Sequence, residues 1–282
     1  MDDWYHVGWV SGHKKGFSPS SQNAKLLFEG EGLDRPTKFL LDLFSQYHVE
    51  TTFFIQGEVA LQYPHLVEAI LDEGHEIASH DLHHISPTRR LVLDFYQDIT
   101  KSKRILESIC GEKIIGYRSP NAQIDEERML AVKRCGFGYD SSIYPCIPIP
   151  GFYGRPLAPT QPYRLNFHNL SAKSKCSHFW EFPIAVIPFF RIPAGSSWYT
   201  RNFGYRASQI ALMSQMRKGV AMYYMHPYEF SDKLPRFLPV PRHTFRRTGQ
   251  VMRNMLIGLL RTIASKGRFC SCRSYLDYMG TI

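Results

Sequence analysis

The spacing of apolar side chains alternates between two periods along most of the chain. Apolar positions three and four residues apart, bounded by capping residues, prolines or glycines, predict amphipathic helices. These begin near Asp34, cover 59–73, run from Ser86 to about Cys110 and from Asp125 to just before Gly136, and recur around 205–218 and near 248–266. Short, continuous apolar runs between them predict buried strands over 51–55, 75–79, 114–117, 137–140, 180–186 and 220–225.

Repeated strand–helix units over this length predict an α/β fold with parallel strands, either a barrel or a doubly wound sheet. In both architectures the functional site lies at the carboxyl ends of the strands. One stretch, 143–178, contains six prolines and no clear periodicity, and it is too long for an ordinary connection. We interpret it as a functional loop layer inserted into a single domain that spans 1–282, with a basic, helical region at 231–282.

The composition restricts the class of protein. A chain of 282 residues with 44% hydrophobic and 14% aromatic side chains can bury a large core, which excludes intrinsic disorder and a disulfide-stapled miniprotein. The net charge of +9 is uneven, because residues 201–282 hold 14 basic and 3 acidic side chains against 20 and 22 in the remainder. Such asymmetry can mark a nucleic-acid, membrane or anionic-glycan partner, but a solvated basic surface is the commoner explanation, and we expect no nucleic-acid partner.

The start of the chain and its cysteines bear on location. The first residues, MDDWYHVGWV, are acidic and lack the long apolar core of a secretory signal, and the longest apolar stretches, such as 184–190, are far too short to span a membrane. Six scattered cysteines include no C-x-x-C pair, so we expect buried free thiols. These features predict a cytoplasmic protein without a membrane span.

Three polar motifs follow predicted strands. His80 and His84 lie four residues apart after the strand at 75–79, and helical spacing would place both imidazoles on one face. Two imidazoles and a carboxylate form a divalent-metal site with open positions for water and substrate. The alternative is a pair of solvent-exposed histidines.

The other two motifs are GYRSPN, with Arg118, and MHPYE, with His226. Arg118 can hold a carboxylate beside a turn whose N–H groups face a ligand, or be an ordinary surface arginine. His226 is delivered by an apolar strand, or is a satisfied core histidine. If the strands are parallel, all three motifs converge on one pocket.

Together, these segments resemble the polysaccharide deacetylase family, which has the NodB homology domain. The similarity runs from the first residues to about Phe230 and includes TTFFIQGEVALQYPHLVEAILDEGHEIASHDLHH, GYRSPN, GFGYDSSIYP and MHPYE. The segments DWYHV, EFP and HPYE are similar to a subgroup associated with bacterial exopolysaccharide loci. The resemblance implies a deformed (β/α) barrel that removes N-acetyl groups from amino sugars with the help of a divalent metal, which we expect to be Zn²⁺.

The resemblance also implies residue roles. His80 and His84 match the metal-binding histidines, Arg118 matches the arginine that steadies the catalytic aspartate, and His226 matches the catalytic acid. Asn121 matches the position whose backbone N–H helps to stabilise the oxyanion. His83 receives no role, and His75 is expected to be structural.

The acidic motif of the family is represented only by Asp2 and Asp3, which directly follow Met1. We assign Asp2 as the base and Asp3 as a metal ligand, although the pair can also act the other way round. The aspartate that the subgroup has further upstream is missing, and we hypothesise that the barrel lacks its first strand. Edge exposure and poorly held carboxylates would follow from that loss.

The expected function is removal of N-acetyl groups from an amino-sugar-containing polysaccharide or oligosaccharide. Substrate-binding roles are expected for Tyr117, Pro120, Trp198 and Tyr199, and Tyr153 is also available to stack on a sugar ring. Two alternatives remain: an allantoinase-like hydrolase of non-peptide C–N bonds in a small molecule, and an inactive glycan-binding homologue. The partner in the leading hypothesis is an acetylated amino-sugar glycan.

Overall fold

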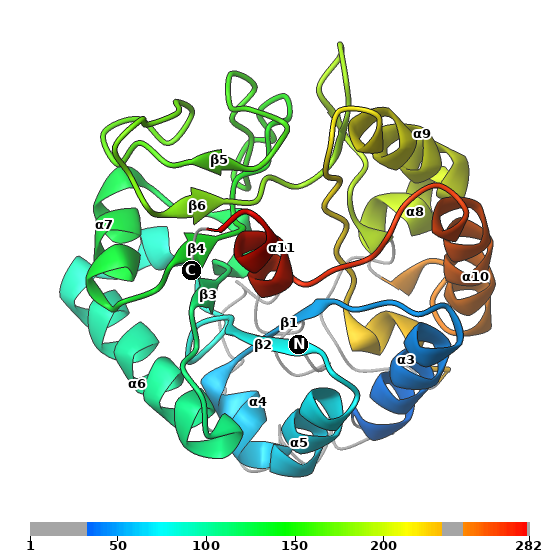
Figure 1. Cartoon of the computed structure of the whole chain (residues 1–282), viewed down its shortest axis with the longest axis horizontal. Helices are drawn as coiled ribbons and strands as arrows, with labels where there is room; N and C mark the ends of the chain where they lie inside the picture. The colour runs from blue at the N-terminus through cyan, green and yellow to red at the C-terminus, as the bar shows by residue number, and fades with distance from the viewer. Residues whose placement is uncertain (1–32, 233–244, 281–282) are drawn as a thin grey trace.

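The centre of the molecule is a six-stranded sheet. The computed structural model describes residues 33–232 and 245–280, and within them the strand order is β1-β2-β3-β4-β6-β5 (Figure 1). Each neighbouring pair from β1 to β6 is parallel, and β5 pairs with β6 in the antiparallel direction. The strands are β1 (Thr52–Ile55), β2 (Glu76–Ser79), β3 (Gly116–Tyr117), β4 (Tyr139–Asp140), β5 (Tyr163–Arg164) and β6 (Trp180–Glu181).

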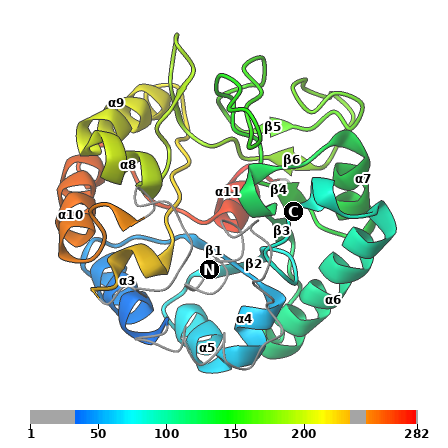
Figure 2. The ribbon, with the colours of Figure 1, turned by 180° about the vertical axis from the view of Figure 1, so that it is seen from behind.

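Helices surround these strands in Figures 1 and 2. The first group is α3 (Asp34–Gln46), α4 (Gly57–Gln62), α5 (Pro64–Asp72), α6 (Val92–Cys110) and α7 (Glu126–Arg134). The second group is α8 (Ser197–Phe203), α9 (Tyr205–Met216), α10 (Gln250–Ala264) and α11 (Cys272–Tyr278), and three short 3₁₀ turns are η1 (Pro87–Arg89), η2 (Pro120–Ala122) and η3 (Pro227–Phe230). The α/β class predicted from the apolar periodicity is confirmed.

The first half of the chain follows its sequence pattern closely. All four residues of β2 are buried, and β1 pairs with β2 in register from Thr52 opposite Glu76 to Ile55 opposite Ser79. Asp125 caps α7 as predicted, because its carboxylate accepts the N–H of Arg128.

The prediction of one helix over 59–73 is wrong. Two helices occupy this stretch, since Pro64 starts α5 and has no N–H with which to continue α4.

The second half departs further from its pattern. The strand predicted over 180–186 is divided between β6 and β7 (Val186–Ile187), and β7 forms a separate two-stranded sheet with β8 (Ile192–Pro193). The strand predicted over 220–225 is reduced to two isolated parallel bridges, which join Met222 to Ile184 and Tyr224 to Ser196.

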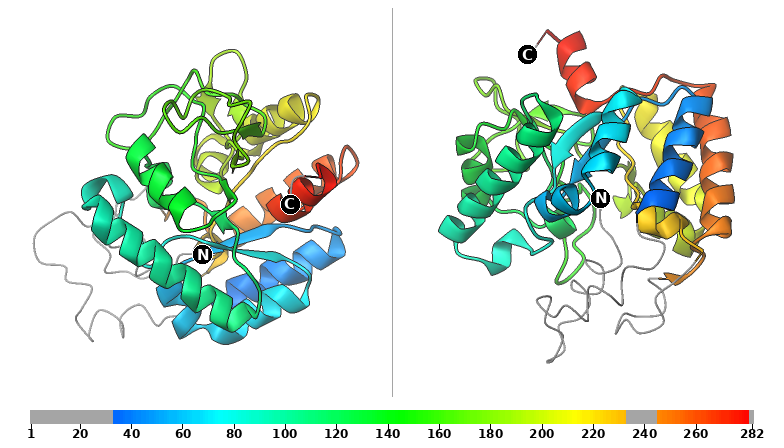
Figure 3. Two further views of the ribbon diagram at one scale, coloured as in Figure 1. Left: turned by 60° about the vertical axis from the view of Figure 1, so that its left-hand side comes forward. Right: turned by 90° about the horizontal axis from the view of Figure 1, so that it is seen from below.

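The helix α11 closes one end of the sheet. The N–H of Cys272 donates to Thr52 Oγ1 at 2.9 Å, and the N–H of Arg273 donates to Glu76 Oε2 at 3.0 Å. Both acceptors stand where β1 and β2 begin, so α11 covers the amino ends of the strands. Figure 3 shows this helix at one end of the molecule, which leaves the carboxyl ends for the candidate site.

The thiols fall into three classes of burial within the described residues. Cys146 and Cys272 are buried, Cys110 and Cys135 are half-buried, and no cysteine of the six forms a disulfide. Burial raises the pKa of the Cys146 thiol to about 12. The expectation of buried free thiols therefore holds for part of the set and is wrong for Cys176 and Cys270, which are exposed.

Two further predictions concern a membrane span and the first strand of the barrel. None of the helices in the described ranges combines the length and apolar character that a membrane crossing requires. The hypothesis about the first barrel strand falls on residues 1–32, which lie outside the described residues, as does 233–244 within the basic C-terminal region.

Candidate functional site

The histidine pair lies directly after β2. His80 and His84 are 7% and 8% exposed, and their ring centroids are 5.2 Å apart at an angle of 70°. The N–H of His80 donates to the carbonyl of Ile55 at 2.9 Å, which fixes its backbone beside the end of β1. The structure brings the two imidazoles together as the sequence predicted. The predicted reason is wrong, because residues 80–84 form a bend and not a helix.

Asp81 holds that bend in place. Its backbone is left-handed, with φ of 73°. Its carboxylate accepts a hydrogen bond from the N–H of Leu82 at 2.7 Å and forms an ion pair with Arg90. Burial raises the pKa of Asp81 to about 6, although the charge of Arg90 opposes the shift. A short acidic side chain suits this position because aspartate tolerates left-handed backbone better than most residues do.

The remaining histidines of the segment have other surroundings. His83 lies at the surface and pairs with Glu58 at 2.9 Å, in keeping with the absence of an assigned role. His75 is buried, stacks on Phe53 and meets the edge of Phe44, and burial lowers its pKa. Its surroundings are those of a structural residue.

Arg118 follows β3 and lies beside the histidine pair. Its backbone carbonyl is 2.7 Å from His80 Nδ1, and because a carbonyl can only accept, this contact places the hydrogen on Nδ1 and the lone pair on Nε2. The guanidinium lies over the rings of Phe54 and Tyr224, at 4.1 Å and 5.5 Å, and it donates to Ser141 O and Oγ. Burial lowers the pKa of Arg118.

The turn after Arg118 has an uncommon backbone. Asn121 has φ of 58° and Ala122 has φ of 52°, both in the left-handed region. Asparagine tolerates this region better than most residues do, whereas alanine is strained there. Strain of this kind gathers at functional sites, which agrees with the role that the sequence predicted for the turn; that role itself stays a prediction.

Two buried carboxyl groups, those of Asp140 and Glu181, belong to a hydrogen-bond network that supports the same turn. Asp140 accepts hydrogen bonds from Ser142 N and Oγ, both at 2.7 Å, and Ser142 Oγ in turn accepts the N–H of Ser119 at 2.8 Å. Burial and the adjacent Asp140 raise the pKa of Glu181. This network fixes the start of the turn by direct hydrogen bonds.

His226 is positioned by a buried ion pair. Glu229 Oε2 accepts the His226 N–H at 3.0 Å and lies 3.4 Å from His226 Nδ1. The other oxygen, Oε1, pairs with Arg201 Nη2 at 2.6 Å, and Arg201 and Glu229 are both 0% exposed. Burial opposes ionisation, but Arg201 and the hydrogen bonds from His226 and Ser197 lower the pKa of Glu229 to about 2. A carboxylate whose pKa lies far below neutral pH thus orients the imidazole.

The three motifs form one continuous constellation. His80 contacts Arg118 through its Nδ1, Arg118 lies over the ring of Tyr224, and Tyr224 meets His226 edge to face with ring centroids 5.5 Å apart. Segments almost 150 residues apart therefore meet in one place, with His80 and Arg118 after paired parallel strands and His226 after two isolated parallel bridges.

The described residues contain only part of the predicted metal site. No group of three histidine, cysteine, aspartate or glutamate side chains that could hold a metal occurs within 33–232 and 245–280. The carboxylates predicted for the site, Asp2 and Asp3, lie outside the described residues. Their roles stay predictions.

The predicted substrate-binding residues have different exposures. Tyr117 is fully buried and packs against two phenylalanine rings, and Pro120 is buried in the turn. Tyr199 is 8% exposed and its hydroxyl lies 2.9 Å from that of Tyr153, whereas Trp198 is half-buried. The tyrosines support the walls of the site in this conformation, and their contact with substrate is untested.

Sequence reasoning did not identify Arg201 and Glu229. An arginine within a helix resembles a surface residue, and its partner lies 28 positions away. One signal was present, however: His226 and Glu229 have the spacing of a capping box, in which the side chain three positions after the N-cap residue reaches back to it, and η3 contains this arrangement.

Comparison with known proteins divides the chain near the end of β4. Residues 26–139 match the family described as polysaccharide deacetylase, and residues 141–277 match a domain of unknown function, DUF3473. Over 101 residues the chain is 32% identical to a peptidoglycan-N-acetylglucosamine deacetylase of Bacillus cereus, a match covering 36% of this chain and 47% of that protein. The matches thus span about half the length of the curated relatives.

Solved structures with the same fold include a probable polysaccharide deacetylase from Pseudomonas aeruginosa. It has a TM-score of 0.61 at 15% identity and covers 96% of this chain and 79% of its own. Puue allantoinase has a TM-score of 0.59, also at 15% identity, with 89% and 72% covered. These likenesses confirm the predicted deformed-barrel α/β fold, and at such identities they carry nothing about activity.

Proposed function

We propose that the protein is a metal-dependent hydrolase which removes N-acetyl groups from an amino-sugar-containing glycan, on the premise that residues 26–139 match the polysaccharide deacetylase family. The observation that carries the proposal is the constellation of His80, Arg118 and His226 at the carboxyl strand ends. Amide hydrolysis of this kind adds water across the acetyl C–N bond and gives acetate and a free amine.

The histidine pair fits a divalent cation. A metal-bound imidazole commonly donates its other ring N–H to a backbone carbonyl, and His80 Nδ1 meets the carbonyl of Arg118 in that way. His84 would be the second ligand and Asp3 the third. When bound, a cation such as Zn²⁺ would polarise the acetyl carbonyl as a Lewis acid.

The remaining roles are assigned to side chains of the chain itself. His226, held through Nδ1 by Glu229, would present Nε2 to the departing amine and supply its proton. Asp2 would remove the proton of the attacking water, with Arg118 steadying it, and the Asn121 N–H would stabilise the developing oxyanion. Each of these roles requires only a positioned hydrogen-bonding or acid–base group.

The glycan itself is the finer part of the proposal. The B. cereus relative is named for peptidoglycan, but the segments DWYHV, EFP and HPYE favour an exopolysaccharide substrate.

Acetate release tests the proposal. Chitotetraose, a neutral oligomer of N-acetylglucosamine, is incubated with chelator-treated protein before and after addition of Zn²⁺ or Co²⁺, and acetate is quantified. We expect release only with metal, and its loss in His84→Ala. The matched control is His83→Ala, which changes a half-buried histidine one residue away and should retain release.

Two other outcomes select the rival functions. Hydrolysis of allantoin without acetate release from any acetylated oligosaccharide would select the small-molecule hydrolase. Oligosaccharide binding without acetate release under any metal would select the inactive glycan-binding homologue.

A further inference from the structure

A cavity of about 490 Å³ is lined in part by Tyr144 and Tyr153, which pack in one cluster with Tyr224 of the constellation. Thr88 and Arg89 on one side come from η1, shortly after His84, and Gln123 follows Asn121 by two residues. The volume lies within the range of roughly 300–1,000 Å³ that is usual for small-ligand pockets. The cavity is therefore large enough for a ring next to the one that carries the reacting acetamide.

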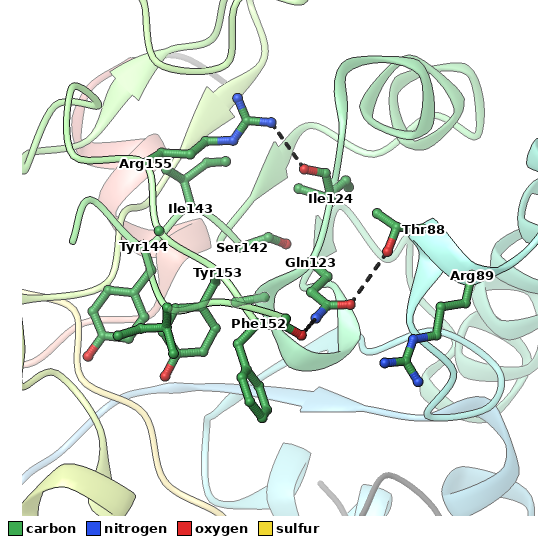
Figure 4. A pocket seen from close by; sticks show the side chains of 14 residues that line it. Thr88, Arg89, Gln123, Ile124, Ser142, Ile143, Tyr144, Phe152, Tyr153 and Arg155 are labelled. Atoms are coloured by element: carbon green, nitrogen blue, oxygen red, sulfur yellow. Dashed lines mark hydrogen bonds between the residues drawn. The ribbon is translucent and has the colours of Figure 1, made fainter. Parts of the chain in front are cut away.

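One wall of the cavity is aromatic. Phe152 is 56% exposed, and beside it the rings of Tyr144 and Tyr153 stack with centroids 5.0 Å apart. Figure 4 shows these three side chains on one side of the cavity and Arg89 on the other, with Gln123 between them. Flat apolar faces of this kind suit the C–H face of a pyranose ring.

The base of the cavity is polar and fixed. Gln123 Nε2 donates to the carbonyl of Gly151 at 2.7 Å, and Gln123 Oε1 accepts a hydrogen bond from Ser86 and lies 3.4 Å from Thr88 Oγ1. The loop that carries Phe152 is thereby joined to the turns that follow the two site motifs. A ligand would meet a pre-formed surface, which lowers the entropic cost of binding.

The charged side chains that the structure describes in the lining of the cavity are basic. Among the described residues, this lining includes Arg89 and Arg155 and no aspartate or glutamate. Arg155 is engaged, because it pairs with Glu126 at 2.9 Å and donates to Ile124 O. Arg89 is exposed, and its guanidinium has no hydrogen bond or ion pair with any residue that the structure describes. An unneutralised guanidinium at the mouth of a pocket favours an anion.

We propose that this cavity is a subsite for an acidic sugar, in which Phe152 stacks on the pyranose ring and Arg89 binds the ring's carboxylate. The inference rests on the proposed function, because it places this ring next to the acetylated amino sugar in the same chain. A guanidinium matches a carboxylate with two parallel hydrogen bonds, whereas a neutral hydroxymethyl group offers no such partner. The substrate class is thus a glycan with adjacent amino-sugar and uronic-acid units.

Binding to a defined probe tests the subsite. The probe is a tetrasaccharide of alternating N-acetylglucosamine and glucuronic acid, and its neutral analogue carries the same sugars as carboxyl methyl esters. Calorimetry with the full chain should show that the acid binds about tenfold or more tightly than the ester, because charge-assisted hydrogen bonds are stronger than neutral ones. Arg89→Gln should remove this preference, and Phe152→Ser should weaken both ligands.

The matched control is Arg104→Gln, which removes the same charge from an exposed arginine on α6. It should leave the preference unchanged. Equal binding of acid and ester by the unaltered protein, binding of neither, or an equal effect of Arg89→Gln and Arg104→Gln would each overturn the subsite.

Acetate release separates this inference from the proposed function. Release from chitotetraose with no acid preference in binding would support the deacetylase and remove the subsite. An acid preference that depends on Arg89, together with no acetate release from either oligosaccharide, would retain the subsite and remove the deacetylase.

Discussion

The two halves of the site hold their functional side chains by different means. In 33–139, His80 and Arg118 follow paired strands, and each backbone N–H donates to the neighbouring strand at 2.9 Å. In 141–277, His226 follows a segment with only isolated bridges, and the buried charges of Glu229 and Arg201 fix its position. The first half relies on the sheet itself, and the second replaces missing sheet with one ion pair.

The largest expected effects are on metal binding in the first half of the site and on turnover in the second. His84→Ala should remove both bound metal and acetate release. His226→Ala should keep the metal while turnover falls roughly 10²–10⁴-fold, since a proton donor acts in the transition state more than in binding. Metal content by mass spectrometry and separate kcat and KM values check this, and an unchanged kcat in His226→Ala would remove that residue from the reaction.

Breaking the buried ion pair between Glu229 and Arg201 should destabilise the second half of the site. Glu229→Gln leaves Arg201 without its charge partner and should lower the free energy of unfolding by about 3–5 kcal/mol, as measured by urea titration.

The control for that substitution is Asp232→Asn. It removes a partly exposed pair with Arg253 and should cost less than about 1 kcal/mol. Similar losses in the two variants would contradict the role given to burial.

Acid should weaken the same half. The pKa of Glu229 is lowered from 4.5 to about 2, so its stabilising effect is complete well above pH 4.5 and is lost as pH falls toward 2. The difference in unfolding free energy between the unaltered protein and Glu229→Gln should shrink by about 2 kcal/mol from pH 6 to pH 3. A difference that stays constant over this range would show that Glu229 titrates normally.

The smallest effect concerns the first half. Asp125→Ala removes the cap of α7 and should cost about 1 kcal/mol, while Asp125→Asn, which can also cap a helix, should cost almost nothing. Neither change should alter the pH dependence assigned to Glu229. Thermal unfolding of both variants measures the difference, and equal losses would show that the cap is not the cause.

Sequence reasoning succeeded where one segment determines its own structure. The strand before His80 and the cap at Asp125 follow from local apolar runs and from one polar side chain at a helix start. The bend at 80–84 was missed because its shape depends on the ion pair from Asp81 to Arg90, and not on local periodicity.

The second half was harder to predict for the same reason. A run as apolar as 220–225 normally pairs along its whole length, but here Met222 bridges Ile184 and Tyr224 bridges Ser196, and pairing is limited to these single bridges. The contact between Arg201 and Glu229 depends on two distant segments meeting, which no local pattern reports. Arg89 and Phe152 line one cavity because η1 and the loop layer, which are distant in sequence, both contribute to its walls.

The buried Cys146 makes the loop layer open to measurement by chemistry. Its thiol packs among Tyr144, Ile184 and Tyr199, while Cys176 and Cys270 are exposed. A thiol reagent should therefore modify the exposed pair at once and reach Cys146 only during moments when the layer separates from the barrel. With the other cysteines replaced, the modification rate would report how often that separation occurs, and a bound oligosaccharide spanning the layer should slow it.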